Sequence, residues 1–96
     1  MTFTVAARYT VTDGNTDAVL NLLEQVRTLT LQEPGCLSYE PHRSADDDNI
    51  VFIIEKYREP ADFDHHFASD HVQEIVLQQI VPMLTERLVT KGTPAL

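Results

Sequence analysis

The chain has 96 residues, of which 15 are acidic and 7 are basic, so its formal net charge at pH 7 is −8. A chain of this length forms one domain and is too short for two, so we expect a single domain over residues 1–96. The acidic balance argues against nucleic acid, heparin or an anionic membrane as the main partner, because each of these requires a basic surface.

Cys36 is the only cysteine, so an intrachain disulfide cannot form and a secreted, disulfide-stabilised scaffold is excluded. The first residues alternate between polar and apolar types and do not resemble a signal peptide. The longest apolar run, residues 50–54, is far too short to cross a bilayer. We therefore expect a cytoplasmic protein that has no membrane partner.

The first third of the chain predicts a strand followed by a helix. Residues 3–11 alternate between apolar and polar types, which indicates a strand with one buried face. Residues 13–15 are suited to a turn and to the start of a helix. Apolar side chains then recur at three- and four-residue steps over residues 19–30, and the amphipathic helix that they predict stops at Glu33–Gly35.

A hairpin is predicted next. Residues 36–43 alternate again, residues 44–49 form a polar turn, and residues 50–57 are rich in β-branched and aromatic types. Both faces of the last segment are apolar, which is expected when one face meets the helices and the other meets a second sheet. This pattern is our reason to expect a homodimer.

The last third predicts two helices and a strand. Residues 60–68 begin with a proline that suits the first turn of a short helix, and Ser69 or Asp70 can cap the next helix. Pro82 ends or kinks that helix, and residues 87–91 return as a short strand. The resulting β-α-β-β-α-β order predicts a ferredoxin-like α+β fold, with one antiparallel four-stranded sheet and helices on one face.

The sequence has no phosphate-binding glycine loop, no G-x-S-x-G motif, no H-E-x-x-H motif and no pair of C-x-x-C motifs. The remaining candidates for chemistry are polar residues of the third strand and the short helix, namely Glu55, Tyr57, Asp62, Asp64, His65, His66, Asp70 and His71. His66 lies four residues after Asp62, so we expect Asp62 to orient its imidazole. A histidine that titrates near neutrality is a candidate base for a phenol or enol, and the alternative is a purely structural role.

Metal and nucleophile sites are less well supported by the pattern. No two histidines are three or four residues apart within one helix, so we predict no metal site. Residues 46–49 resemble the start of a calcium loop but lack its glycine and closing glutamate, which favours a solvated turn. Cys36 has no neighbouring base and is interpreted as a small core residue.

Two segments carry a resemblance to a known family. Residues 33–39 read EPGCLSY and resemble the EPGC-x-x-Y segment of the antibiotic biosynthesis monooxygenase family. Residues 55–71 resemble that family's E-x-W-x(3)-A-x-L-x(2)-H-x(2)-S-x-H stretch without a gap. The resemblance covers nearly the whole chain and implies a dimeric α+β barrel, in which two sheets pack together and each subunit keeps a pocket between its sheet and its helices.

The resemblance also implies a function. The characterised members of this family include cofactor-independent monooxygenases that oxidise quinols or anthrone-like polycyclic phenols to quinones with dioxygen. An electron-rich phenolate can give an electron to dioxygen directly, so the protein must only bind, deprotonate and shield it. Carried onto this sequence, the implied catalytic residues are His66 as base, Tyr57 in the place of the family's tryptophan, and Glu55. The implied substrate-binding residues are Tyr39, His71, Ala7 and Phe63.

Three other functions were weighed. Haem-degrading relatives carry an asparagine in the place of Ala7 and a tryptophan in the place of Tyr57, so haem degradation is not expected. A non-catalytic dimeric module that binds a small aromatic molecule stays open, as does an isomerase of the same fold. A phosphorylated substrate of such an isomerase would need cations, for which Arg8, Arg43 and Lys56 are candidates.

Overall fold

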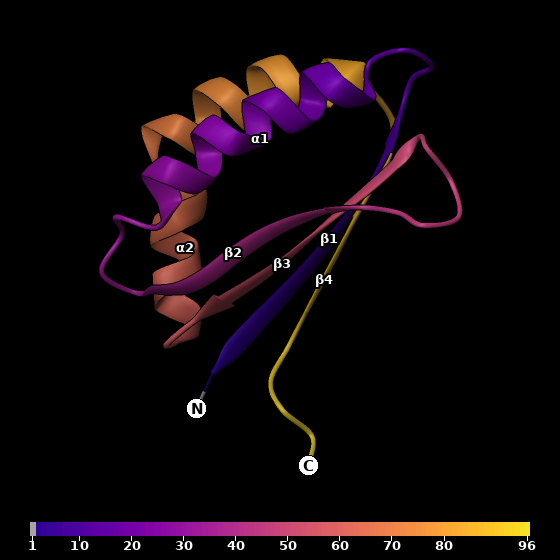
Figure 1. The fold of residues 1–96 in the computed structure, drawn as a ribbon. Helices are drawn as coiled ribbons and strands as arrows, with labels where there is room; N and C mark the ends of the chain where they lie inside the picture. Colours follow the sequence, from indigo (N-terminus) through magenta and orange to yellow (C-terminus); the bar gives the residue numbers. More distant parts are fainter. Residues whose placement is uncertain (1) are drawn as a thin grey trace.

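The computed structural model describes residues 2–96 and contains one antiparallel four-stranded sheet with helices on one face (Figure 1). The strands are β1 (Phe3–Val11), β2 (Cys36–Arg43), β3 (Ile50–Tyr57) and β4 (Leu84–Gly92). The helices are α1 (Thr16–Thr30), α2 (Pro60–Ala68) and the π-helical η1 (Val72–Ile80), followed by a single 3-10 turn, η2 (Val81–Met83). The sheet order is β2-β3-β1-β4, so the predicted ferredoxin-like fold is confirmed.

The first three strands have the predicted bounds, whereas β4 is longer than predicted. Residues 87–91 were expected to form it, and the observed strand also includes Leu84 and Gly92. β4 is longer because it pairs with β1 along almost the whole length of β1, from Thr4 opposite Gly92 to Val11 opposite Leu84. A neighbouring strand can therefore extend a segment whose own sequence gives only a weak strand signal.

The turns that the sequence predicted are formed as local chemistry requires. Gly14 has a φ angle of 83°, a backbone conformation that favours glycine over residues with a side chain. Pro60 stands in the first turn of α2, where its missing N–H costs nothing. Ser69 Oγ accepts a hydrogen bond from the backbone N–H of Val72 at 3.4 Å, so Ser69 caps the start of η1. Pro82 lies in the turn between η1 and β4 and ends the helix.

The core lies between the sheet and the pair α1 and η1, which run side by side across one face (Figure 1). Every second residue of β1 and β3 points into it, since side chains alternate along a strand. The largest aliphatic contribution from α1 is Leu23, which is fully buried and stabilises the fold by about 1.5–3 kcal/mol. The other buried members of this core are Ala7, Tyr9, Val11, Val19, Val26, Tyr39, Val51, Ile53, Val72, Val76 and Ile80.

The other face of the sheet has no covering helix within residues 2–96. Phe52 and Ile54 of β3 are half-buried on this face, and Leu88 of β4 is 48% exposed. The imidazole of His42 stacks on the Phe52 ring at 4.8 Å between centroids. Both faces of β3 are thus apolar, as the sequence predicted, and only one of them is covered. No helix within residues 2–96 has the length and hydropathy needed to cross a membrane.

Candidate functional site

The candidate site lies where the loop after α1, the end of β3 and the last turn of α2 meet. Glu55 and Tyr57 are two residues apart on β3, so both side chains point to the helix-covered face. His66 projects from α2 toward them. All three residues are buried, with exposed fractions of 5%, 0% and 4% for Glu55, Tyr57 and His66. Buried polar side chains of this kind need partners, and each of them has one.

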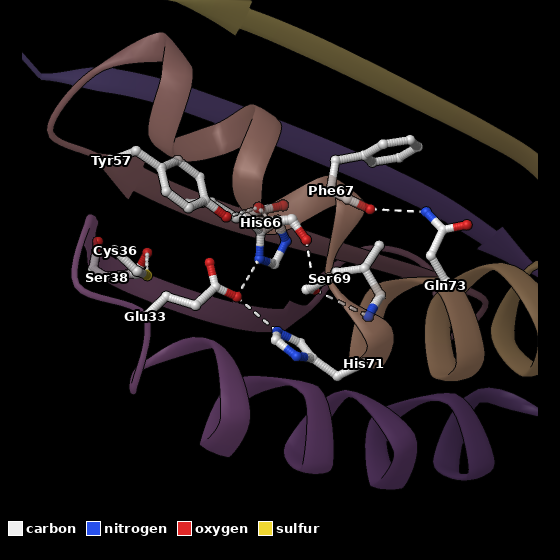
Figure 2. A network of polar contacts seen from close by, with 11 residues as sticks. Glu33, Cys36, Ser38, Tyr57, His66, Phe67, Ser69, His71 and Gln73 are labelled. Carbon is white, nitrogen blue, oxygen red and sulfur yellow. Dashed lines mark hydrogen bonds and ion pairs between the residues drawn. The ribbon is translucent and has the colours of Figure 1, made fainter.

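Glu33 holds two histidines from the opposite side (Figure 2). Its Oε2 lies 3.0 Å from His66 Nδ1 and 2.7 Å from His71 Nε2. Glu33 comes three residues after the end of α1, and its backbone N–H donates to the carbonyl of Thr30 at 3.0 Å. The other carboxylate oxygen, Oε1, is buried without a hydrogen-bond partner among residues 2–96. A buried carboxylate in this position favours a donated N–H from each imidazole.

The Glu33 contact fixes the tautomer of His66. When Nδ1–H of the neutral ring donates to Glu33, the lone pair lies on Nε2. That nitrogen lies 3.6 Å from Glu55 Oε1. The same Glu55 oxygen accepts a hydrogen bond from the Tyr57 hydroxyl at 2.6 Å. The arrangement is a chain of four polar groups, from Glu33 through His66 and Glu55 to Tyr57.

Burial perturbs the acid–base properties of this chain. Burial raises the pKa of Glu55 to about 7, although the Tyr57 hydrogen bond and the charge of Arg87 oppose the increase. Burial lowers the pKa of His66, and the Glu33 hydrogen bond opposes that decrease. Burial therefore disfavours the charged form of both neighbouring groups, the carboxylate of Glu55 and the imidazolium of His66. Neighbouring groups whose pKa values are shifted by burial are candidates for acid–base chemistry.

The tyrosines around the site are hydrogen-bond donors rather than bases. Burial raises the pKa of Tyr57, and the adjacent Glu55 carboxylate raises it further. Burial also raises the pKa of Tyr39 well above its ordinary value. Both phenols therefore stay protonated at physiological pH. Partial burial likewise raises the pKa of the Cys36 thiol to about 11, so the thiol stays protonated. Cys36 was interpreted as a small core residue, and it packs against the core while partly buried.

Two adjoining cavities lead to His66. The outer cavity, between α2 and β4, has a volume of about 480 Å³ and is lined by Phe63, Asp64, Phe67, Arg87, Val89 and Lys91. The inner cavity is only about 20 Å³, room for a single water molecule, and its walls include Glu55, His66, Tyr39 and Ala7. Four residues line both cavities, namely Phe63, Phe67, Arg87 and Val89.

The structure brings most of the predicted site residues to these cavities. Five of them line the inner cavity: His66, Glu55, Tyr39, Ala7 and Phe63. Tyr57 and His71 line neither cavity. Tyr57 reaches the site through its hydrogen bond to Glu55, and His71 through its hydrogen bond to Glu33.

The expectation that Asp62 orients His66 is wrong. The carboxylate of Asp62 forms an ion pair with Arg58, 3.8 Å away, and His66 Nδ1 pairs with Glu33 instead. Spacing of four along a helix permits a contact without requiring it, and a better-placed carboxylate from a distant segment has taken the role.

Sequence reasoning also missed the roles of Glu33 and Arg87. From the sequence, Glu33 was given no role at the site and was used only to mark the end of a helix and the start of the EPGC segment. Its place in the segment that carries the family resemblance is the signal that could have identified it. Arg87 lies on the predicted last strand, where alternation places it on the same face as Val89 and Lys91. The three cations that were candidates to bind a phosphorylated substrate do not line either cavity. Arg43 pairs with Asp17 at 2.6 Å, and Arg8 and Lys56 are on the open sheet face.

A metal ion has one geometrically suitable place in residues 2–96. Glu33, His66 and His71 offer three ligand atoms that all lie within 4.8 Å of one another. The donor types fit a 2-His-1-carboxylate set. Direct hydrogen bonds already join these same atoms, and a metal would have to replace both of them. The absence of a metal site therefore stays a prediction, which metal removal can test.

Two sequence comparisons, with a family model and with a named relative, both match proteins described as monooxygenases. The family model described as "Antibiotic biosynthesis monooxygenase" matches residues 2–77. A protein named "Putative monooxygenase Rv0793", from Mycobacterium tuberculosis, is 36% identical over 67 residues. That match covers 70% of this chain and 65% of the relative, which is slightly less than two thirds of its length. The family match includes Glu33, Glu55, His66 and His71 and ends before β4.

Comparison with solved structures extends the similarity to the whole fold. The structure of Rv0793 from Mycobacterium tuberculosis has a TM-score of 0.90 at 30% identity, covering 98% of this chain and 95% of that one. Protein SO0527 from Shewanella oneidensis has a TM-score of 0.89 at 28% identity, covering 95% and 88%. A Nitrosomonas europaea structure described as a "Putative antibiotic biosynthesis monooxygenase" has a TM-score of 0.93 at 18% identity, covering 98% and 90%. This last likeness concerns the fold alone.

Proposed function

We propose that this protein is a monooxygenase. The premise is that the chain belongs to the antibiotic biosynthesis monooxygenase family. The protein would oxidise a small quinol or polycyclic phenol with dioxygen and without a cofactor. A hydroquinone would lose two protons and two electrons to dioxygen, which becomes hydrogen peroxide, so that with this substrate the enzyme acts as an oxidase and no oxygen atom enters the product. With an anthrone-type phenol, one oxygen atom would enter the product and the other would leave as water.

The observation that carries this proposal is the hydrogen bond between Glu33 and His66 at 3.0 Å. It leaves the lone pair of His66 on Nε2, beside Glu55, at the inner cavity that His66 and Glu55 line. A phenol at this position would give its proton to Nε2, and the Glu33 carboxylate would stabilise the imidazolium that forms. Glu55, about half-protonated near pH 7, would accept or return the second proton.

The surroundings support electron transfer from a phenolate to dioxygen. Phe63 is 8% exposed, and together with Phe67 and Val89 it gives the cavities apolar walls. Such walls exclude water, so that a phenolate loses solvation and its electrons become easier to donate. Tyr39 lines the inner cavity, and its protonated hydroxyl could donate to a substrate oxygen.

The two volumes limit how a substrate enters. The outer cavity of about 480 Å³ has room for a fused aromatic ring system, whereas the inner cavity of about 20 Å³ does not. A ring in the outer cavity reaches His66 only if a shared wall moves. Of the two aromatic residues that line both cavities, Phe67 is the more exposed, at 39% against 8% for Phe63. We propose that rotation of Phe67 joins the two cavities when substrate binds.

The test is oxygen consumption by metal-stripped protein with a panel of hydroquinones and anthrones. We expect uptake above the rate of spontaneous autoxidation, unchanged by prior treatment with EDTA. His66→Ala should lower the enzymatic rate by about 10²–10⁴, the range for loss of a general base. His65→Ala is the matched control, because His65 is the exposed neighbour on the same helix. Uptake that survives in His66→Ala, or that requires an added metal, would contradict the proposal.

A second candidate is a binding module without turnover. The small inner cavity and the two histidines already satisfied by Glu33 favour it, since both features also suit a purely structural cluster. Binding of an aromatic ligand with no oxygen uptake, and with affinity unchanged in His66→Ala, would identify this function. An isomerase of the same fold would instead turn over its substrate equally well with and without dioxygen.

We also propose that the protein is a homodimer that buries the open face of the sheet. The support is the row of apolar side chains on that face, in which Phe52 and Ile54 are half-buried and Leu88 is 48% exposed. An uncovered apolar sheet face is a common site of association. A second copy of the chain offers the same face, so that two sheets can pack about 10 Å apart.

A further inference from the structure

We infer that the molecule bound in the outer cavity carries an acidic group, such as a carboxylate, and that Arg87 and Lys91 hold it. The inference rests on the proposed function for the phenolic part of the substrate and adds the charged part. It concerns β4, which lies beyond residues 2–77 that the family model matches. Arg87 and Lys91 are therefore features of this chain rather than of the matched motif.

The register of β4 places the two cations together. Arg87 is opposite Tyr9 and Lys91 is opposite Val5, so both are on the helix-covered face of the sheet. Val89 lies between them on the same face. Four residues of strand separate their Cα atoms by about 13 Å, and both side chains are long enough to reach the space above Val89. Both residues line the outer cavity.

Neither of these two cations has an ion-pair partner among residues 2–96, which is also true of Arg8, Arg27 and Lys56. The chain has 15 acidic residues and only 7 basic ones, so there are more than enough carboxylates for every cation to form an ion pair. Arg43 and Arg58 do form ion pairs, with Asp17 and Asp62. Among residues 2–96, neither Arg87 nor Lys91 has a carboxylate within 4.0 Å.

Each cation lies close to other residues that line the cavities. Lys91 Nζ lies 5.0 Å from the centroid of the Phe63 ring, a cation–π contact at the outer cavity. Burial raises the pKa of both Tyr9 and Glu55, and Arg87 is close enough to oppose that rise in each group. Within residues 2–96, the charged residues that line the outer cavity are Asp64, Arg87 and Lys91, so this lining carries a net charge of about +1 in a chain of −8.

This arrangement selects an anionic ligand and orients it. The planar guanidinium of Arg87 can bind a carboxylate through two parallel hydrogen bonds, and the ammonium of Lys91 adds a point charge. The apolar surface of Phe63, Phe67 and Val89 suits the ring of the same molecule. An acid held over Val89 leaves the far end of the ring free to reach the inner cavity and His66.

The test compares two ligands that differ only in the acidic group and that do not react with dioxygen. Binding of 6-hydroxy-2-naphthoate and of 2-naphthol is measured by isothermal titration calorimetry at pH 7.5. We expect the acid to bind roughly tenfold more tightly, because 2-naphthol lacks the carboxylate and so cannot form the charge-assisted hydrogen bonds to Arg87 and Lys91. Added salt should weaken binding of the acid and leave binding of the naphthol almost unchanged.

Three variants locate the effect. Arg87→Gln and Lys91→Gln should each lower the affinity for the acid several-fold and change the affinity for the naphthol by less than about twofold. Arg27→Gln removes the same charge from an exposed position on α1 and should change neither affinity. Circular dichroism checks that each variant is folded, and the salt dependence of the native protein gives a second readout that needs no variant.

The outcomes separate this inference from the proposed function. Equal affinity for the two ligands, no salt dependence, or no binding of the acid would overturn the inference. Oxygen uptake with neutral hydroquinones alone would support the proposed function and overturn the acidic substrate. Preferential binding of the acid, lost in Arg87→Gln and Lys91→Gln, together with no oxygen uptake, would support the inference and overturn the proposed function.

Discussion

Glu55 has a buried carboxyl group whose charge should control the pH dependence of stability. Burial raises its pKa from an ordinary value of 4.5 to about 7. Between these two pH values the folded protein binds more protons than the unfolded chain, so the free energy of unfolding falls as pH rises. Above pH 7 the full penalty for the buried charge is present. The penalty is absent below pH 4.5.

The magnitude follows from the two pKa values. Their difference corresponds to roughly 3 kcal/mol at 1.36 kcal/mol per pKa unit, of which about 2–3 kcal/mol falls between pH 5 and pH 8. The isosteric change Glu55→Gln removes the charge and keeps an oxygen that can accept from the Tyr57 hydroxyl. A neutral acceptor forms a weaker bond, by about 1 kcal/mol. We therefore expect Glu55→Gln to be about 1–2 kcal/mol more stable than the native protein at pH 8, and less stable or equal at pH 5.

The assay is urea denaturation followed by circular dichroism at pH 5, 6, 7 and 8, at one protein concentration because association also stabilises. His66 titrates in the opposite sense. Burial lowers its pKa, so its contribution to stability is lost as pH falls below 6.5, and this loss is common to both proteins. Glu24→Gln, at an exposed position of α1, is the control. Parallel pH profiles for the native protein and Glu55→Gln would refute the reasoning.

Two further predictions concern the loop after α1 and the open sheet face. A Cβ added at Gly35 would overlap the side chain of Asp62, whereas one added at Gly92 would meet nothing within 4 Å. Gly35→Ala should therefore cost about 1–3 kcal/mol of stability by urea denaturation, and Gly92→Ala should cost little. Phe52→Glu places a charge on the proposed dimer face and should give monomers by sedimentation velocity, while Leu31→Glu, at an exposed position after α1, should not. A native protein that sediments as a monomer would contradict the homodimer.

The sequence by itself determined the elements and their order. The bounds of β1, β2 and β3 follow from alternation and from the turns between them, which are local signals read within a few residues. Proline and glycine ended the helices where the chain needed to reverse. The apolar character of both faces of β3 also came from the sequence, because side-chain period in a strand is fixed by backbone geometry. Membership of the family was predicted from two short segments, residues 33–39 and residues 55–71, and the family match over residues 2–77 confirms it.

Only the tertiary structure decided the partners of each polar group. His66 pairs with Glu33, 33 residues away, and not with Asp62 one turn earlier, because the loop after α1 brings a buried carboxylate against the end of α2. The length of β4 was set by its ladder with β1. The raised pKa of Glu55 depends on burial beneath α2, and the cavity that Arg87 lines exists only because β4 and α2 meet across it. Local periodicity shows which face a side chain takes, and long-range packing decides what it meets there.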